Sequence, residues 1–239
     1  MLCYNTIIIK AVEKAAKAYA MRRCLGKEVR QVKRRKRKAD ENTIDTVSNV
    51  VEFCIPEPDH HADRIRKFTE CLGRGIMQMC PEYGLTVSAL EAIVHASAIH
   101  DIGKLAVPEE ILQKPGKLSG QEWEIVKLHT IQGDEMIRNL MYLDDEGIHD
   151  VCCDIARHHH ERYDGGGYPD GLKGEEISIG AQTVALADVY DALLSKRTYK
   201  EAVEPDQAFM MIMAGECGVF SPKLLRVFEK VRKEMEELI

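Results

Sequence analysis

Apolar residues recur along most of the chain at intervals of three and four, which is the spacing of one face of an α-helix. No segment alternates between apolar and polar residues for long enough to predict a β-strand. Two boundaries are sharpened by capping residues, since Ser119 with Glu122 forms a capping-box pattern and Ser221 precedes a proline. The pattern predicts an all-α bundle with helices at 7–38, 42–54, 61–79, 86–100, 119–141, 148–160, 180–195, 205–215 and 222–237.

The N-terminal helix is expected to differ from the others. It carries a heptad-like apolar stripe and ends in six consecutive basic residues, 33–38. The stripe predicts a stem that pairs with a second copy and couples to an upstream sensor. The basic run is interpreted as a solvated helix face or linker, with binding to an acidic partner as the alternative. We therefore divide the chain into a helical stem, 1–43, and a folded domain, 44–239. The stripe consists of Val12, Ala16, Tyr19, Leu25, Val29 and Val32.

Charge is distributed unevenly and excludes some classes of partner. Residues 1–39 hold thirteen lysines and arginines against two glutamates, while the whole chain is −6, so residues 40–239 carry −17. A domain that acidic is a poor surface for DNA or RNA. No apolar run approaches the length of a membrane span, and no secretory signal pattern is present. The eight cysteines form no CxxC pair and indicate thiols in a reducing cytosol, so we expect a cytoplasmic protein.

The longest stretch without helical periodicity follows three consecutive histidines, residues 158–160. Five glycines lie between 161 and 179, and Tyr168-Pro169 closes the first glycine cluster. A loop of that length in a compact helical domain is more often functional than idle. Taken alone, the histidines fit a solvated surface turn as well as they fit a metal site.

Further histidines and acids lie on predicted helices with apolar neighbours, which directs them inward. His129, for example, is expected to share an inward helix face with Trp123, Val126 and Gly133. A single inward histidine, or a single His-Asp pair, is usually a satisfied or salt-bridged core group. Buried carboxylates are costly without a cation, however, and here several helices each contribute such a side chain. The combination favours metal bound between the helices of the bundle. The set comprises Glu57, His61, His100, Asp101, His129, Asp188 and Asp191.

In order and spacing these motifs resemble the HD-GYP domain, a subgroup of the HD-superfamily phosphohydrolases. The resemblance covers about residues 44–230, and the Gly-Tyr-Pro sequence at 167–169 is the feature for which the family is named. It suggests the output half of a response regulator, here with no receiver domain. The motifs are Glu57-x3-His61, His100-Asp101-Ile102-Gly103-Lys104, His129, His159-His160-Glu161-Arg162-Tyr163-Asp164-Gly165-Gly166-Gly167-Tyr168-Pro169 and Asp188-Val189-Tyr190-Asp191-Ala192.

The resemblance implies an HD-superfamily helical bundle with a centre of two or three divalent transition-metal ions. Iron or manganese is expected, and zinc also suits mixed histidine and carboxylate ligands. Asp101 is the bridging candidate, Glu57 is expected to decide whether a third ion binds, and His158 is not a motif position. Asp191 and Glu161 are expected to support the ligands from behind. The implied ligands are Glu57, His61, His100, Asp101, His129, His159, His160 and Asp188.

The resemblance also implies a substrate and the residues that meet it. Asp101 and Lys104 are the expected catalytic residues, and Lys104, Tyr168, Arg197 and Lys200 are expected to bind substrate. The leading hypothesis is hydrolysis of cyclic di-GMP to linear pGpG, with further cleavage to GMP left open, in bacterial two-component signalling. The alternatives are a phosphohydrolase of another nucleotide or hybrid cyclic dinucleotide, and a non-catalytic module that senses cyclic di-GMP. Expected partners are a second copy, an upstream sensor or a protein of the diguanylate-cyclase type.

Overall fold

A computed structural model describes residue 28 and residues 31–55, 60–143, 145–196 and 202–239. Within these ranges all regular structure is helical, which confirms the predicted fold class. In the same ranges no helix has the length and apolar character that a membrane span requires. The predicted site residues Glu57, Arg197 and Lys200, and the part of the stem stripe that precedes Val32, lie outside the described residues.

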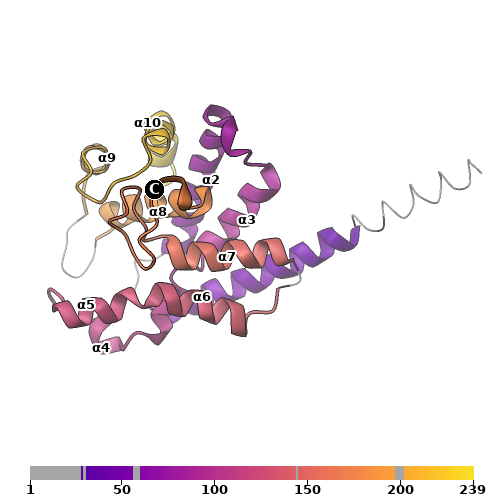
Figure 1. The fold of residues 1–239 in the computed structure, drawn as a ribbon, viewed down its shortest axis with the longest axis horizontal. Helices are drawn as coiled ribbons and strands as arrows, with labels where there is room; N and C mark the ends of the chain where they lie inside the picture. Colours follow the sequence, from indigo (N-terminus) through magenta and orange to yellow (C-terminus); the bar gives the residue numbers. More distant parts are fainter. Residues whose placement is uncertain (1–27, 29–30, 56–59, 144, 197–201) are drawn as a thin grey trace, which may run out of the picture.

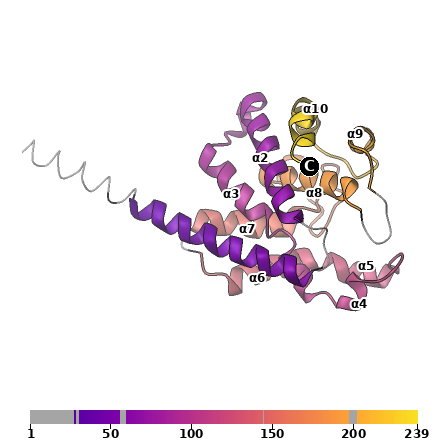
Figure 2. The ribbon, with the colours of Figure 1, turned by 180° about the vertical axis from the view of Figure 1, so that it is seen from behind.

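The first described helix covers residues 31–54 and projects from the body of the molecule (Figures 1 and 2). The prediction of two helices, ending at 38 and starting again at 42, is wrong, because the helix continues through 39–41. These three residues, Ala39, Asp40 and Glu41, include no proline or glycine, so nothing in the backbone ends the helix there. One face of the helix contributes Ile44 and Val51 to the core, and Ile55 follows directly after it.

Twelve helical elements follow, and their arrangement is shown in Figure 1. They are α2 (His61–Met79), η1 (Pro81–Tyr83), α3 (Val87–Ser97), η2 (Ile102–Ala106), α4 (Glu109–Leu112), α5 (Gly120–Lys127), α6 (His129–Leu140), α7 (Glu146–His158), η3 (Gly174–Glu176), α8 (Ile179–Leu194), α9 (Pro205–Met213) and α10 (Pro222–Glu236). The predicted helices at 61–79 and 222–237 correspond closely to α2 and α10.

Two apolar clusters fill the interior, and α2 and α8 contribute to both of them. The first cluster joins the 31–54 helix to α3, α6 and α7, and α2 supplies Ile65 to it. The second joins α9 and α10 to Phe68 of α2 and Tyr190 of α8. Complete burial of a side chain such as Phe68 contributes roughly 1.5–3 kcal/mol to folding. Because α2 and α8 belong to both clusters, they are packed from two sides, against α6 and α7 in the first cluster and against α9 and α10 in the second.

The predicted helix 119–141 is divided in two at Leu128, where α5 ends and α6 begins. At this joint, side chains form hydrogen bonds to backbone carbonyl oxygens. His129 Nδ1 lies 2.6 Å from the carbonyl oxygen of Val126, and the Thr130 hydroxyl donates to the carbonyl of Lys127 at 2.9 Å. His129 therefore stands at the first position of a new helix. The expectation that Trp123 shares its inward face is wrong, since Trp123 is 45% exposed.

Candidate metal centre

The histidines and acids predicted to bind metal come together from separate elements, in the interior between α2, α6, α7 and α8. Each of these residues lies at or near the end of a helical element, except Asp188, which lies within α8. Gly103 permits the close packing, because a Cβ atom there would collide with the carbonyl oxygen of His129. The described members are His61, His100, Asp101, His129, His159, His160 and Asp188.

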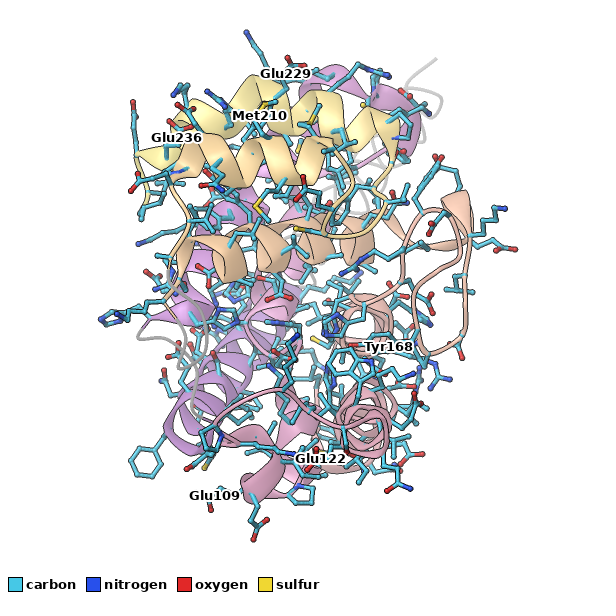
Figure 3. All side chains as sticks on the ribbon, turned by 90° about the vertical axis from the view of Figure 1, so that its left-hand side faces the viewer. Glu109, Glu122, Tyr168, Met210, Glu229 and Glu236 are labelled. Atoms are coloured by element: carbon cyan, nitrogen blue, oxygen red, sulfur yellow. The ribbon has the colours of Figure 1, made fainter. Side chains whose placement is uncertain are left out.

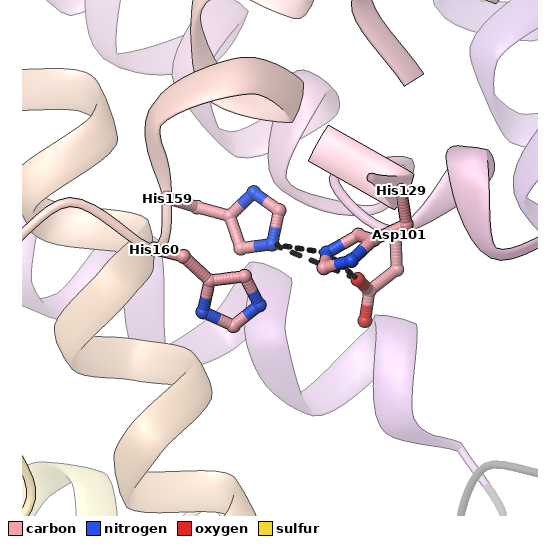
Figure 4. A group of neighbouring side chains, drawn as sticks. All are labelled: Asp101, His129, His159 and His160. Carbon is pink, nitrogen blue, oxygen red and sulfur yellow. Dashed lines mark hydrogen bonds and ion pairs between the residues drawn. The ribbon is translucent and has the colours of Figure 1, made fainter. Parts of the chain in front are cut away.

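One donor group consists of Asp101, His129, His159 and His160, whose ligand atoms all lie within 4.8 Å of one another. Asp101 Oδ1 is 3.2 Å from His129 Nε2 and 3.6 Å from His159 Nε2. The two imidazole Nε2 atoms are 3.4 Å apart. Figure 4 shows these rings with nitrogens turned toward the carboxylate. Four donors around one point are a suitable set for a divalent metal ion.

A second donor group consists of His61, His100 and the same Asp101. Asp101 Oδ2 is 3.2 Å from His100 Nε2. Asp188 faces this group, with Oδ1 3.8 Å from His100 Nε2 and 4.0 Å from His61 Nε2. The two oxygens of Asp101 thus point into different donor groups. The predicted role of Asp101 as a bridge between ions has this geometric basis.

Hydrogen bonds on the opposite side of each ring fix which nitrogen faces the centre. The Nδ1 atoms of His100, His129 and His159 lie 2.8, 2.6 and 2.9 Å from the carbonyl oxygens of Ser97, Val126 and Ile155. A carbonyl oxygen can only accept, so each Nδ1 must donate. Nε2 then faces the centre, as a metal-binding imidazole requires.

His61 is oriented by a side chain instead of by the backbone. Its Nδ1 lies 2.8 Å from Asp191 Oδ2, and the guanidinium of Arg64 also binds Asp191. Asp191 was expected behind the ligands, and it contacts His61 on the side of the ring that faces away from the donor group. Arg64 was not predicted, although its position three residues after His61 on α2 puts both on one helix face.

The centre contains buried polar atoms that no described group satisfies. His61 Nε2 and Asp101 Oδ1 are buried and have no hydrogen-bond partner among the residues of the structure. Buried polar atoms are rarely left unpaired in folded proteins. Both atoms point into the donor groups, and a divalent cation would satisfy them. The residues present therefore fit the divalent metal that their chemistry implies.

Electrostatics keep the candidate ligands in the protonation states that metal binding requires. Burial lowers the pKa of His159 to about 4, and burial with the neighbouring histidines holds the pKa of His160 well below its ordinary value. Burial would raise the pKa of Asp101, but the charges of Lys104 and His100 hold it well below its ordinary value. At neutral pH these histidines are neutral and Asp101 is ionised, as metal ligands must be.

His100 behaves differently from the other imidazoles. Burial opposes its charged form, but Asp101 and Asp188 outweigh burial and raise the pKa of His100 to about 10. Either a proton on His100 Nε2 or a divalent cation can neutralise the carboxylates of Asp101 and Asp188. Metal binding at the second donor group is therefore expected to displace this proton.

The glycine-rich loop after α7 is held by Glu161 and by a charge cluster at Asp170. The buried Glu161 carboxylate accepts the backbone N–H groups of Asp170, Gly171 and Leu172 at 2.8, 3.0 and 3.1 Å, so it supports the loop backbone instead of a ligand side chain. Asp170 receives two hydrogen bonds from Arg157, at 2.7 and 2.8 Å, and lies 3.0 Å from His158 Nε2. His158 thus contacts the loop and not the donor groups.

The loop brings Tyr168 over the first donor group. Its ring stacks on His160, with centroids 4.8 Å apart and planes inclined by 27°. The Lys104 ammonium lies 2.7 Å from Asp101 Oδ2. Two of the four residues predicted to meet substrate, Lys104 and Tyr168, therefore lie beside the donor atoms. Sequence reasoning missed the pairing of Arg157 with Asp170, because no spacing rule links positions thirteen residues apart across a loop.

A family model for the HD domain matches residues 45–222, so the chain belongs to the HD domain family. A 3'3'-cGAMP-specific phosphodiesterase of Vibrio cholerae is 36% identical over 191 residues, covering 80% of this chain and 34% of that protein. The cyclic di-GMP phosphodiesterase response regulator RpfG of Xanthomonas campestris is 40% identical over 157 residues, covering 66% and 40%. A cyclic di-GMP phosphodiesterase of Thermotoga maritima is 34% identical over 194 residues, covering 81% and 52%.

The chain thus spans between about a third and a half of the length of these relatives. Two solved structures share the fold at 18% identity. An HDG"Y"P protein of Bdellovibrio bacteriovorus has a TM-score of 0.54 and covers 80% of this chain and 62% of its own. A cyclic GMP-AMP specific phosphodiesterase of V. cholerae has a TM-score of 0.56 and covers 83% and 50%. The predicted resemblance to HD-GYP proteins is confirmed.

Proposed function

We propose that the domain is a metal-dependent phosphodiesterase that hydrolyses cyclic di-GMP to linear pGpG. The observation that carries the proposal is the position of Asp101, whose two oxygens face two separate donor groups. A carboxylate shared in this way is typical of sites that hold two metal ions a few Å apart and cleave phosphodiesters. The names of the relatives from Xanthomonas campestris and Thermotoga maritima support the same substrate.

The proposed metals are iron or manganese, with zinc as the alternative, because imidazole and carboxylate ligands suit all three. His129, His159 and His160 with Asp101 would hold one ion. His61, His100, Asp101 and Asp188 would hold a second. Glu57, which lies outside the described residues, is proposed to complete a site for a third.

Divalent ions in these sites would supply stabilisation of phosphoryl charge and an activated water. The chain itself supplies positioning. The Lys104 ammonium is close enough to the shared carboxylate to meet an oxygen of the reacting phosphate. Tyr168 covers the first donor group and gives the substrate a ring to pack against. Arg197 and Lys200 are proposed to bind the phosphate that is not cleaved, Arg197 through a bidentate contact.

A second candidate substrate is 3'3'-cGAMP, for which the Vibrio cholerae relative is named. The two cyclic dinucleotides differ in one purine, so the metal centre would serve both equally. Whichever substrate is cleaved faster, the same donor groups are proposed to act. Whether cleavage continues to GMP depends on release of the linear product, and following the product over time decides it.

The test uses protein purified without chelators, loaded anaerobically with iron or manganese, and assayed with both dinucleotides. Asp101→Asn is expected to lose most bound metal and all measurable hydrolysis. Asp150→Asn, which alters an exposed acid on α7, is the control and should retain both. Glu57→Ala should lower the metal content by about one ion. Full metal content in Asp101→Asn would refute the shared carboxylate. A wild-type protein that binds metal but cleaves neither dinucleotide would refute the proposed activity.

We further propose that the helix at 31–54 pairs with a second copy and relays a signal from an upstream sensor or a diguanylate-cyclase-type partner. Support comes from the apolar side chains that it exposes, Val50 at 51% and Phe53 at 91%. Exposed apolar side chains that gather on one helix are typical of a surface that is covered in an assembly. Sedimentation of the full chain is expected to show a dimer that Phe53→Glu weakens.

A further inference from the structure

Trp123 stands at the outer end of a row of rings that begins at the first donor group. Tyr168 stacks on His160, and Trp123 meets Tyr168 edge to face, with centroids 6.2 Å apart and planes at 82°. Trp123 is 45% exposed, so much of the indole is open to solvent. Tyr168 lies on the same side of the molecule as Glu122, the neighbour of Trp123 on α5 (Figure 3). The row therefore leads from the metal centre to the surface.

The helix that carries Trp123, α5, is held at its N-terminus by several side-chain hydrogen bonds. Ser119 and Glu122 form a capping box, and both oxygens of Glu122 also bind Lys114, at 2.8 and 2.7 Å. One turn after Trp123, the Lys127 ammonium lies 5.8 Å from the centroid of the Tyr168 ring. The helix thus presents an indole and, one turn later, an ammonium group at the loop that covers the site. This ammonium is paired with the exposed carboxylate of Glu124 at 2.7 Å.

We propose that Trp123 stacks on a purine base of the substrate, with Lys127 beside it to attract a phosphate. This inference rests on the proposed function and identifies a residue that would select for a purine. An indole offers a large flat surface at a small cost in conformational entropy, and stacking of a base on it needs no hydrogen-bond pattern. Nearly half of the Trp123 surface is exposed, so a base can reach the indole.

Trp123 is the single tryptophan of the chain, so its fluorescence reports on this position alone. Metal-loaded protein is titrated with GMP, with CMP and with ribose 5-phosphate. We expect saturable quenching by GMP, weaker quenching by CMP and none by ribose 5-phosphate, which has no base. Equal quenching by all three compounds, or none by GMP, would overturn the stacking role.

Kinetics supply the second readout. Trp123→Ala is expected to raise the KM for cyclic di-GMP by roughly 5- to 150-fold, the range that loss of one stacked base produces. Trp123→Phe should recover much of the loss. Metal content and the kcat for cyclic di-GMP should change little, because the stacked base is remote from the reacting phosphate. Ile125→Ala, an exposed apolar residue on the same helix, is the matched control and should leave KM unchanged.

The outcomes separate this inference from the proposed function. If wild-type protein cleaves cyclic di-GMP and Trp123→Ala has an unchanged KM, the stacking role is wrong and the function stands. A fall in kcat or in metal content that accompanies the rise in KM would show that Trp123 merely supports the Tyr168 loop, which also overturns the inference. If wild-type protein cleaves no cyclic dinucleotide but GMP quenches saturably, the function is wrong and a purine site at Trp123 remains.

Discussion

The loop that carries Tyr168 depends on one buried carboxylate, and its replacement gives a sharp test of the structure. Glu161 accepts three backbone N–H groups, two on Oε1 from Asp170 and Gly171 and one on Oε2 from Leu172. In Glu161→Gln, the amide oxygen can still serve the first two donors. The amide NH₂ must then face the N–H of Leu172, so a donor meets a donor.

The magnitude follows from the number and kind of bonds. A hydrogen bond to a charged group contributes about 1.5–3 kcal/mol, and a buried donor left unpaired costs about 1–3 kcal/mol. Glu161→Gln loses the charge and one bond, so we expect the free energy of unfolding to fall by about 2 kcal/mol. Glu161→Ala loses all three bonds. Its global loss is limited, because the loop can open locally and expose its N–H groups to water.

The assay is urea denaturation combined with hydrogen exchange at residues 170–172. The matched control is Glu176→Gln, which alters an exposed glutamate of the same loop that accepts one N–H, from Lys173 at 2.8 Å. We expect its stability to change by less than about 1 kcal/mol. Equal stabilities for Glu161→Gln and Glu176→Gln, with unchanged protection of residues 170–172, would refute the reasoning. Metal content should be retained in both variants.

Two further substitutions test the packing and the orientation of the donor groups. Gly103→Ala should lower the free energy of unfolding by more than about 3 kcal/mol and reduce metal content, because the added Cβ would collide with the backbone of His129. The control is Gly120→Ala, where nothing lies within 4 Å of the Cβ position. This variant should be close to neutral in thermal denaturation. Asp191→Asn should weaken metal binding at the His61 group by about 10- to 100-fold in competition with a chelator, and a variant with wild-type affinity would exclude a role for the Asp191–His61 contact.

Apolar periodicity predicted the helices best where each helix has one buried face and a clear end. The 61–79 prediction agrees with α2, and the 222–237 prediction with α10, which begins after Ser221 at a proline. The joint at Leu128 could not be predicted in this way, since 119–141 keeps a helical pattern throughout. What ends α5 there is a set of side-chain contacts to backbone carbonyls, which periodicity does not encode.

The candidate site shows the same division. Inward histidines such as His129 were identifiable because their helices carry apolar neighbours. The Gly-Tyr-Pro motif pointed to the loop, but not to its internal contacts. Glu161 was expected behind the ligands and instead binds backbone N–H groups, a role that depends on the path of the loop. Trp123 was expected inside and lies at the mouth of the site, because the end of α5 separates its face from that of His129.

The continuity of the 31–54 helix has a mechanical consequence. With a rise of about 1.5 Å per residue the helix is about 36 Å long, and it has no proline or glycine at which it could bend. Ile44 and Val51, in the C-terminal half of the helix, pack in the same apolar cluster as Ile155 of α7. A rotation of the projecting end would therefore be transmitted to the interior, because the helix contains no residue at which it could bend. Because His159 follows α7 directly, a rotation of the 31–54 helix would displace this candidate ligand relative to the other donor residues.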